Sequence, residues 1–150
     1  MKSPSSPEIR VARDLPASPA GVWRIVEPIE RHVDWMADAV SIVFDGPLRR
    51  GVGTRIWCVT AVGPIRLIDH MEITAWEPER TIGVRHDGIV SGSGAFTMEP
   101  IDEGRATRFT WTERLHFPWY LGGPLGAFVG RPVLARIWRR NLEGLAALVS

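Results

Sequence analysis

Apolar and polar residues alternate along most of the middle of the chain, from residue 39 to residue 117. A period of two residues is typical of strands that bury one face and expose the other. Turn-forming sequences interrupt the alternation, and Asp87-Gly88 among them is typical of a tight hairpin. Connections this short favour an antiparallel sheet. The predicted strands are residues 40–44, 54–60, 66–76, 81–86, 90–98 and 107–117.

One further strand and two short helices are predicted before this region. Residues 8–14 alternate apolar and charged side chains, as in a strand with one buried face. Ser18 followed by Pro19 is a favourable helix start, and Pro28 cannot continue that helix. A second short helix is predicted at residues 29–33.

A long helix is predicted at the C-terminal end, from Pro132 to about Val149. Residues 119–130, just before it, are apolar but contain four glycines, so they are expected to form neither a strand nor a helix. The helix carries one apolar stripe that must be buried against the sheet. The stripe consists of Leu134, Ile137, Trp138, Leu145 and Leu148.

This order of elements predicts an α+β fold in which a curved antiparallel sheet of six to seven strands wraps around the C-terminal helix. A twisted sheet and one helix do not fill the space between them, so we expect a ligand cavity there. Residues 8–150 are expected to form one domain. Residues 1–7 are rich in serine and proline and are expected to be a disordered tail.

The ordered set of segments resembles the START-like (SRPBCC) superfamily of helix-grip proteins, nearest to its small bacterial polyketide cyclase/dehydrase-like branch. The resemblance covers roughly residues 8–149 and is carried by residues 15–23, 51–53, 72–78 and 107–111 together with the closing helix. It implies a hydrophobic pocket for a polyketide, lipid, sterol or quinone. It implies no catalytic residue, because the superfamily has no universal catalytic motif and a fold does not determine a reaction.

Composition excludes several classes of function. The net charge of +1 gives no general attraction to nucleic acid, and we expect no nucleic-acid partner. The four histidines are scattered and Cys58 is the lone cysteine, so neither a metal site nor a disulfide is expected. No sequence motif for a cofactor is present, and none is expected. No apolar run is long enough to cross a membrane, and no signal peptide is evident, so a cytoplasmic location is expected.

Two polar residues interrupt predicted apolar faces. Asn141 lies in the middle of the helical stripe, and Glu113 shares a strand face with Trp111 and Leu115. Each needs a partner, because a buried polar group without one costs about 1–3 kcal/mol. Each is therefore a candidate to contact the ligand or to carry catalysis. The alternative for both is a structural role, with Asn141 bonded to the backbone and Glu113 paired within the protein.

Asp69 and His86 are weaker candidates by the same reasoning, because each shares a strand face with apolar residues. His86 is the third catalytic candidate. The remaining ligand-binding candidates are large apolar side chains that we expect to line the cavity or its mouth. They are Trp35, Trp57, Trp111, Trp119, Phe128, Ile137 and Trp138, although core filling explains each tryptophan equally well.

Three functions remain open from the sequence. The leading one is binding, with transport or sequestration, of a small hydrophobic molecule. The second is an enzyme of the cyclase, aromatase or dehydratase type, in which Glu113 would move protons. The third is a lipid or quinone chaperone that makes transient contact with a membrane through residues 119–131, where a glycine-hinged flap precedes several arginines. The sequence does not determine the oligomeric state.

Overall fold

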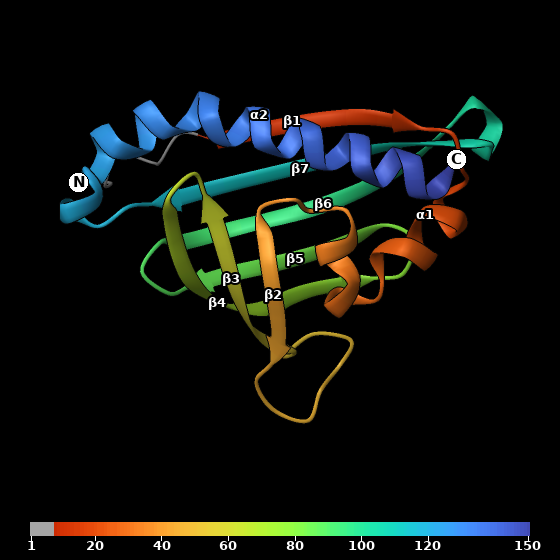
Figure 1. Ribbon diagram of the computed structural model, residues 1–150. Helices are drawn as coiled ribbons and strands as arrows, with labels where there is room; N and C mark the ends of the chain where they lie inside the picture. The colour runs from red at the N-terminus through yellow and green to blue at the C-terminus, as the bar shows by residue number, and fades with distance from the viewer. Residues whose placement is uncertain (1–7) are drawn as a thin grey trace, which may run out of the picture.

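The computed structural model describes residues 8–150 as a seven-stranded sheet with a long helix lying along one face (Figure 1). The tail predicted at residues 1–7 lies outside the described residues. The strands are β1 (Glu8–Leu15), β2 (Ala39–Phe44), β3 (Arg55–Val62), β4 (Ile65–Glu77), β5 (Thr81–Asp87), β6 (Ser91–Ile101) and β7 (Ala106–His116). The helices are α1 (Pro19–Val26), α2 (Gly123–Val149) and the short 3₁₀ helices η1 (Ile29–Asp34), η2 (Asp102–Gly104) and η3 (Trp119–Leu121).

The sheet is antiparallel throughout, in the order β1-β7-β6-β5-β4-β3-β2. Its register is irregular between Ala39 and Ser41 in β2 and between Ile73 and Ala75 in β4. Such irregularities increase the local twist and bend a sheet. The curved sheet and the long C-terminal helix confirm the predicted helix-grip fold.

The start of the long helix differs from the prediction. We expected Pro132 to begin it, but α2 begins at Gly123 and contains Pro132 in its interior. The reason is packing: the ring of Phe117 lies against the helix where Gly126 and Gly130 have no side chain. A Cβ atom added at Gly130 would meet that ring at 3.5 Å. Tertiary contacts of this kind override the weak helix propensity of glycine.

The two halves of α2 have different environments. Trp138, Leu142 and Leu145 in the C-terminal half are buried against the sheet, and Trp138 stacks on Trp111 of β7 with 4.8 Å between ring centroids. Leu148 was predicted to share this buried face, but 46% of it is exposed because it lies at the edge of the face that Ala146 and Val149 of the same turn pack against the core. The helix is therefore held mainly through its middle and C-terminal turns.

A leucine-to-alanine pair on α2 tests this packing. Leu145 is fully buried, so Leu145→Ala should lower the free energy of unfolding by about 2–5 kcal/mol through lost contacts and a cavity. Leu148→Ala, three positions further along the same helix, should cost less than about 1 kcal/mol. Urea denaturation followed by circular dichroism measures both. Equal losses in the two variants would contradict the described orientation of α2.

Candidate functional site

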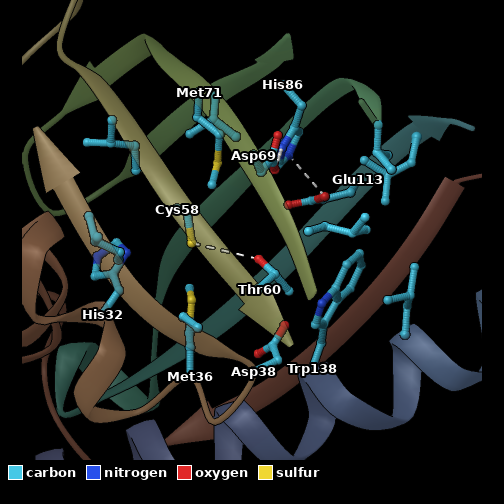
Figure 2. Close-up of a pocket in the computed structure, with 18 of the residues that line it drawn as sticks. His32, Met36, Asp38, Cys58, Thr60, Asp69, Met71, His86, Glu113 and Trp138 are labelled. Carbon is cyan, nitrogen blue, oxygen red and sulfur yellow. Dashed lines mark hydrogen bonds and ion pairs between the residues drawn. The ribbon is translucent and has the colours of Figure 1, made fainter. Parts of the chain in front are cut away.

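A cavity of about 180 Å³ lies between the inner face of the sheet, η1 and α2 (Figure 2). Its walls are mostly apolar. Side chains from β2 to β7 line it, and α2 contributes Leu134 and Trp138. A cavity of about 150 Å³ with apolar walls is large enough to hold one aromatic ring. This cavity is therefore large enough for a small hydrophobic ligand.

Three ionisable side chains gather at one end of the cavity, from strands that are far apart in sequence. Asp69 of β4, His86 of β5 and Glu113 of β7 all line the cavity, and Figure 2 shows His86 between the two carboxylates. His86 Nδ1 lies 2.7 Å from Asp69 Oδ2, and His86 Nε2 lies 3.1 Å from Glu113 Oε2. The first contact is a hydrogen bond, whereas the second is an ion pair that is not aligned as a hydrogen bond.

The two carboxylates determine the charge of His86. Burial by itself lowers the pKa of the imidazole, but the charge of Glu113, the hydrogen bond to Asp69 and the charge of Asp69 outweigh it. They raise the pKa of His86 to about 10. His86 is therefore protonated at neutral pH, and its Nε2–H is a buried donor with no aligned acceptor.

A glycine makes room for Glu113. Gly94 of β6 pairs with Glu113 in the sheet, and a Cβ atom at Gly94 would lie only 2.6 Å from Glu113 Cγ. The carboxylate can thus lie across β6 and reach His86 on β5. Its other oxygen, Oε1, accepts a hydrogen bond of 3.1 Å from Trp111 Nε1. The structural pairing considered for Glu113 is present, and the residue also lines the cavity.

Asn141 does not line the cavity but holds a residue that does. Its Oδ1 accepts a hydrogen bond from the backbone N–H of Ala37 at 3.0 Å, and its Nδ2 donates to Asp38 Oδ1 at 2.6 Å. Asp38 lines the cavity on the side of α2. Burial raises the pKa of Asp38, and the charge of Glu113 adds to this, while the bond from Asn141 works in the opposite direction. Asn141 is thus a positioning residue for Asp38.

The sequence analysis missed four polar residues of the lining, namely His32, Asp38, Cys58 and Thr60. The Nε2 atom of His32 donates to the carbonyl oxygen of Val26 at 2.7 Å. Burial lowers the pKa of His32 to about 4, so it is neutral. Burial raises the pKa of Cys58 to about 11, so the thiol is not a nucleophile at neutral pH. Asp38 lies in a loop, where no periodicity marks a buried face.

Five of the predicted ligand-binding residues line the cavity: Asp69, His86, Trp111, Glu113 and Trp138. Asn141 and five large apolar residues do not. Trp35 is buried among Phe96, Phe109 and Trp111, so it belongs to the core.

The remaining four apolar candidates are placed outside the cavity for different reasons. Trp57 is on the outer face of β3, against His70, because its strand parity is opposite to that of Cys58. Trp119 and Phe128 are 86% and 66% exposed, because η3 and the first turns of α2 project their side chains into solvent. Ile137 is half-buried against the core.

Among residues 8–150, no three histidine, cysteine, aspartate or glutamate side chains are grouped so that they could hold a metal ion. The polar end of the cavity can instead offer hydrogen bonds and a positive charge to one oxygen atom of a ligand. His86 supplies the donor, and Glu113 and Asp69 supply carboxyl groups beside it.

Comparison with known proteins agrees with the helix-grip fold. Residues 6–150 match the protein family described as polyketide cyclase/dehydrase and lipid transport. No curated protein matches the chain. Among solved structures, TTHA0849 from Thermus thermophilus is 21% identical with a TM-score of 0.74, over 95% of this chain and 97% of that one.

Two further solved structures share the fold. The Zhui aromatase/cyclase from Streptomyces sp. R1128 is 16% identical with a TM-score of 0.70, over 95% of this chain and 90% of that one. The hypothetical protein jhp0584 from Helicobacter pylori is 13% identical with a TM-score of 0.77, over 97% of this chain and 89% of that one. At these identities the likeness concerns the fold alone.

The pKa values of the two buried histidines are shifted in opposite directions, so their contributions to stability should depend on pH in opposite ways. The raised pKa of His86 means that it contributes stability that is complete below pH 6.5 and is lost as the pH rises toward 10. The lowered pKa of His32 means that its contribution is present above pH 6.5 and is lost as the pH falls toward 4. Imidazole ¹⁵N shifts should show His86 protonated at about pH 8 and His32 neutral at about pH 5.5. His86→Gln identifies the signal, and a His86 that titrates near 6.5 would contradict the ion pair.

Proposed function

The chain belongs to the polyketide cyclase/dehydrase and lipid transport family, and on that premise we propose that it binds a small hydrophobic molecule in the cavity between the sheet and α2. The observation that carries the proposal is an apolar cavity with a cluster of three ionisable side chains, Asp69, His86 and Glu113, at one end. Such a site takes up apolar surface and orients the ligand by its polar atom. If the protein binds this molecule without converting it, its role is to transport or sequester the molecule, which we propose takes place in the cytoplasm.

Ligand binding should alter the fluorescence of Trp111 and Trp138, because both line the cavity. We expect saturable quenching by one class in a panel of polyphenols, sterols, fatty acids and quinones. Val84→Phe narrows the cavity and should weaken that binding at least tenfold, whereas Val43→Phe changes an exposed position of β2 and should not.

The matched phenylalanine variants decide between the cavity and a surface site. Equal affinity in Val84→Phe and Val43→Phe would place the ligand outside the cavity. A lack of response to every class in the panel would contradict the proposed function itself. Circular dichroism spectra of both variants serve as the control for correct folding.

An enzyme of the cyclase or dehydratase type is the second candidate, favoured by the protonated His86 inside the cavity and by the fold shared with an aromatase/cyclase. A general acid works best when its pKa lies near the working pH. A pKa of about 10 keeps His86 protonated and makes it better suited to holding an oxygen atom than to releasing a proton. This argues for binding over turnover, and recovery of the bound ligand unchanged or converted distinguishes the two.

The mouth of the cavity offers a route for a lipid. Ile68 and Ile89 line the cavity and are largely exposed, and Phe117 and Leu134 line it beside the first turns of α2. Further exposed apolar side chains lie on η3 and the first turns of α2, between Phe117 and Leu134 in the chain, and we call them the mouth patch. It consists of Trp119, Tyr120, Leu125, Phe128, Val129 and Val133.

Charge favours a membrane as the occupant of the mouth patch. Phe128 and Val129 line a surface groove whose charged residues are Arg10, Arg131, Arg139 and a single acidic residue, Glu8. Residues 117–142 contain no acidic residue. Apolar side chains flanked by arginines bind anionic bilayers, at about 1 kcal/mol per basic residue near the surface. The exposed apolar side chains and the arginines beside them are the basis on which we propose contact with a bilayer surface. None of the described helices meets the length and hydropathy of a membrane span.

Co-sedimentation with vesicles tests this contact. The protein should bind vesicles of phosphatidylcholine with phosphatidylglycerol and not phosphatidylcholine alone, and added salt should weaken binding. Phe128→Ser should reduce binding severalfold, whereas Val43→Ser, an exposed apolar position on β2, should not. Absence of binding to anionic vesicles would contradict the proposal. A dimer in solution that Phe128→Ser dissociates would identify a second copy as the occupant instead.

A further inference from the structure

The lining of the cavity has an uneven balance of charge. Three of its side chains are carboxylic, namely Asp38, Asp69 and Glu113, and His86 is the cation among them. Of the described residues that line the cavity, none is an arginine or a lysine. The positive charge of His86 is already shared by two carboxylates within 3.1 Å. A further negative charge placed here would meet repulsion in a weakly solvated site.

His86, the cation of this cluster, has one ring nitrogen without an aligned hydrogen-bond partner. His86 is more than nine-tenths buried, and its Nε2 has no aligned acceptor although Glu113 Oε2 lies 3.1 Å away. A ligand atom that accepts from this donor would recover the cost of leaving it unsatisfied. The matching ligand group must accept from His86 Nε2 and donate to a carboxylate oxygen beside it.

A hydroxyl group meets both requirements, because it carries one donor and two acceptor lone pairs. A carboxylate accepts from His86 but has nothing to donate to Glu113, and it brings a further negative charge. A ketone accepts without donating. The ring systems of Trp111 and Trp138 line the cavity and offer flat apolar surface to the rest of the ligand.

We propose that this cavity selects an uncharged ligand that carries a hydroxyl group, as in a phenol, enol or alcohol, and that it excludes the carboxylate of the same skeleton. The hydroxyl oxygen lies beside the His86–Glu113 pair, where it accepts from His86 Nε2 and donates to the Glu113 carboxylate in place of their direct 3.1 Å contact. The inference rests on the proposed function and narrows it, since free fatty acids and other carboxylates leave the set of ligands. Glu113 is the residue that distinguishes a hydroxyl from a carboxylate on the ligand.

Calorimetric titration with 2-naphthol and 2-naphthoate at about pH 7 tests this selection on the unmodified protein. The two ligands share one ring system, and at this pH the phenol is neutral and the acid is ionised. We expect 2-naphthol to bind at least about tenfold more tightly. Equal or tighter binding of 2-naphthoate would overturn the charge selection while leaving the hydrophobic cavity in place. Absence of binding by both ligands would overturn this inference, and the polyphenol and quinone titrations would then decide the proposed function separately.

A charge-neutralising variant assigns the effect to the cavity. Glu113→Gln should reduce the preference for 2-naphthol about tenfold, mainly by allowing 2-naphthoate to bind. Glu77→Gln makes the same change in net charge at an exposed position at the end of β4 and should leave the preference unchanged. Asp38→Asn is the second cavity variant if Glu113→Gln does not fold. A preference that is unchanged in a folded cavity variant would overturn the role of the carboxylates.

Discussion

The stacking of Trp138 on Trp111 is the contact on which the rest of the structure depends. It joins the middle of α2 to β7 with ring planes only 11° apart, and Leu142 and Leu145 continue the packing toward the C-terminal end. On the other side of the stack, β3, β4 and β5 line the cavity together with Leu134 of α2. The C-terminal half of α2 is therefore packed against the sheet, and the cavity lies beside the part of the helix that precedes Trp138.

The polar groups of the cavity follow from that arrangement. Buried ionisable residues persist only when each has a partner. Asp69 and Glu113 provide partners for His86, and Asn141 provides one for Asp38. Because the partners come from β4, β5, β7, α2 and the loop before β2, these contacts reach both walls of the cavity. They also leave His86 Nε2 and Asp69 Oδ1 without an aligned partner, and the ligand proposed for this cavity would meet the first of these.

The N-terminal turns of α2 show how local sequence and packing can disagree. Four glycines and two prolines within residues 119–132 argue against a helix, yet the segment from Gly123 onward is helical because Phe117 occupies the surface that the glycines leave open. Trp119 of η3 and Phe128 of α2 are exposed here, so they lie outside the cavity to which the sequence analysis assigned them. An exposed apolar face beside a cavity mouth is a feature of the assembled fold and cannot be read from composition.

The sequence by itself determined the succession of strands and helices along the chain, the curved sheet wrapped around the C-terminal helix and the burial of Glu113 and His86, because strand parity and helical spacing are local and follow directly from residue order. It also identified Asn141 as a polar residue in an apolar face. Only the tertiary structure decided which of these residues meet. The path from Asp69 to Glu113 crosses several strands, the room for Glu113 depends on Gly94 of a neighbouring strand, and Asp38 becomes part of the site through Asn141, which is 103 residues away in the chain. Pairings of this kind depend on sheet register and helix placement, which no local pattern encodes.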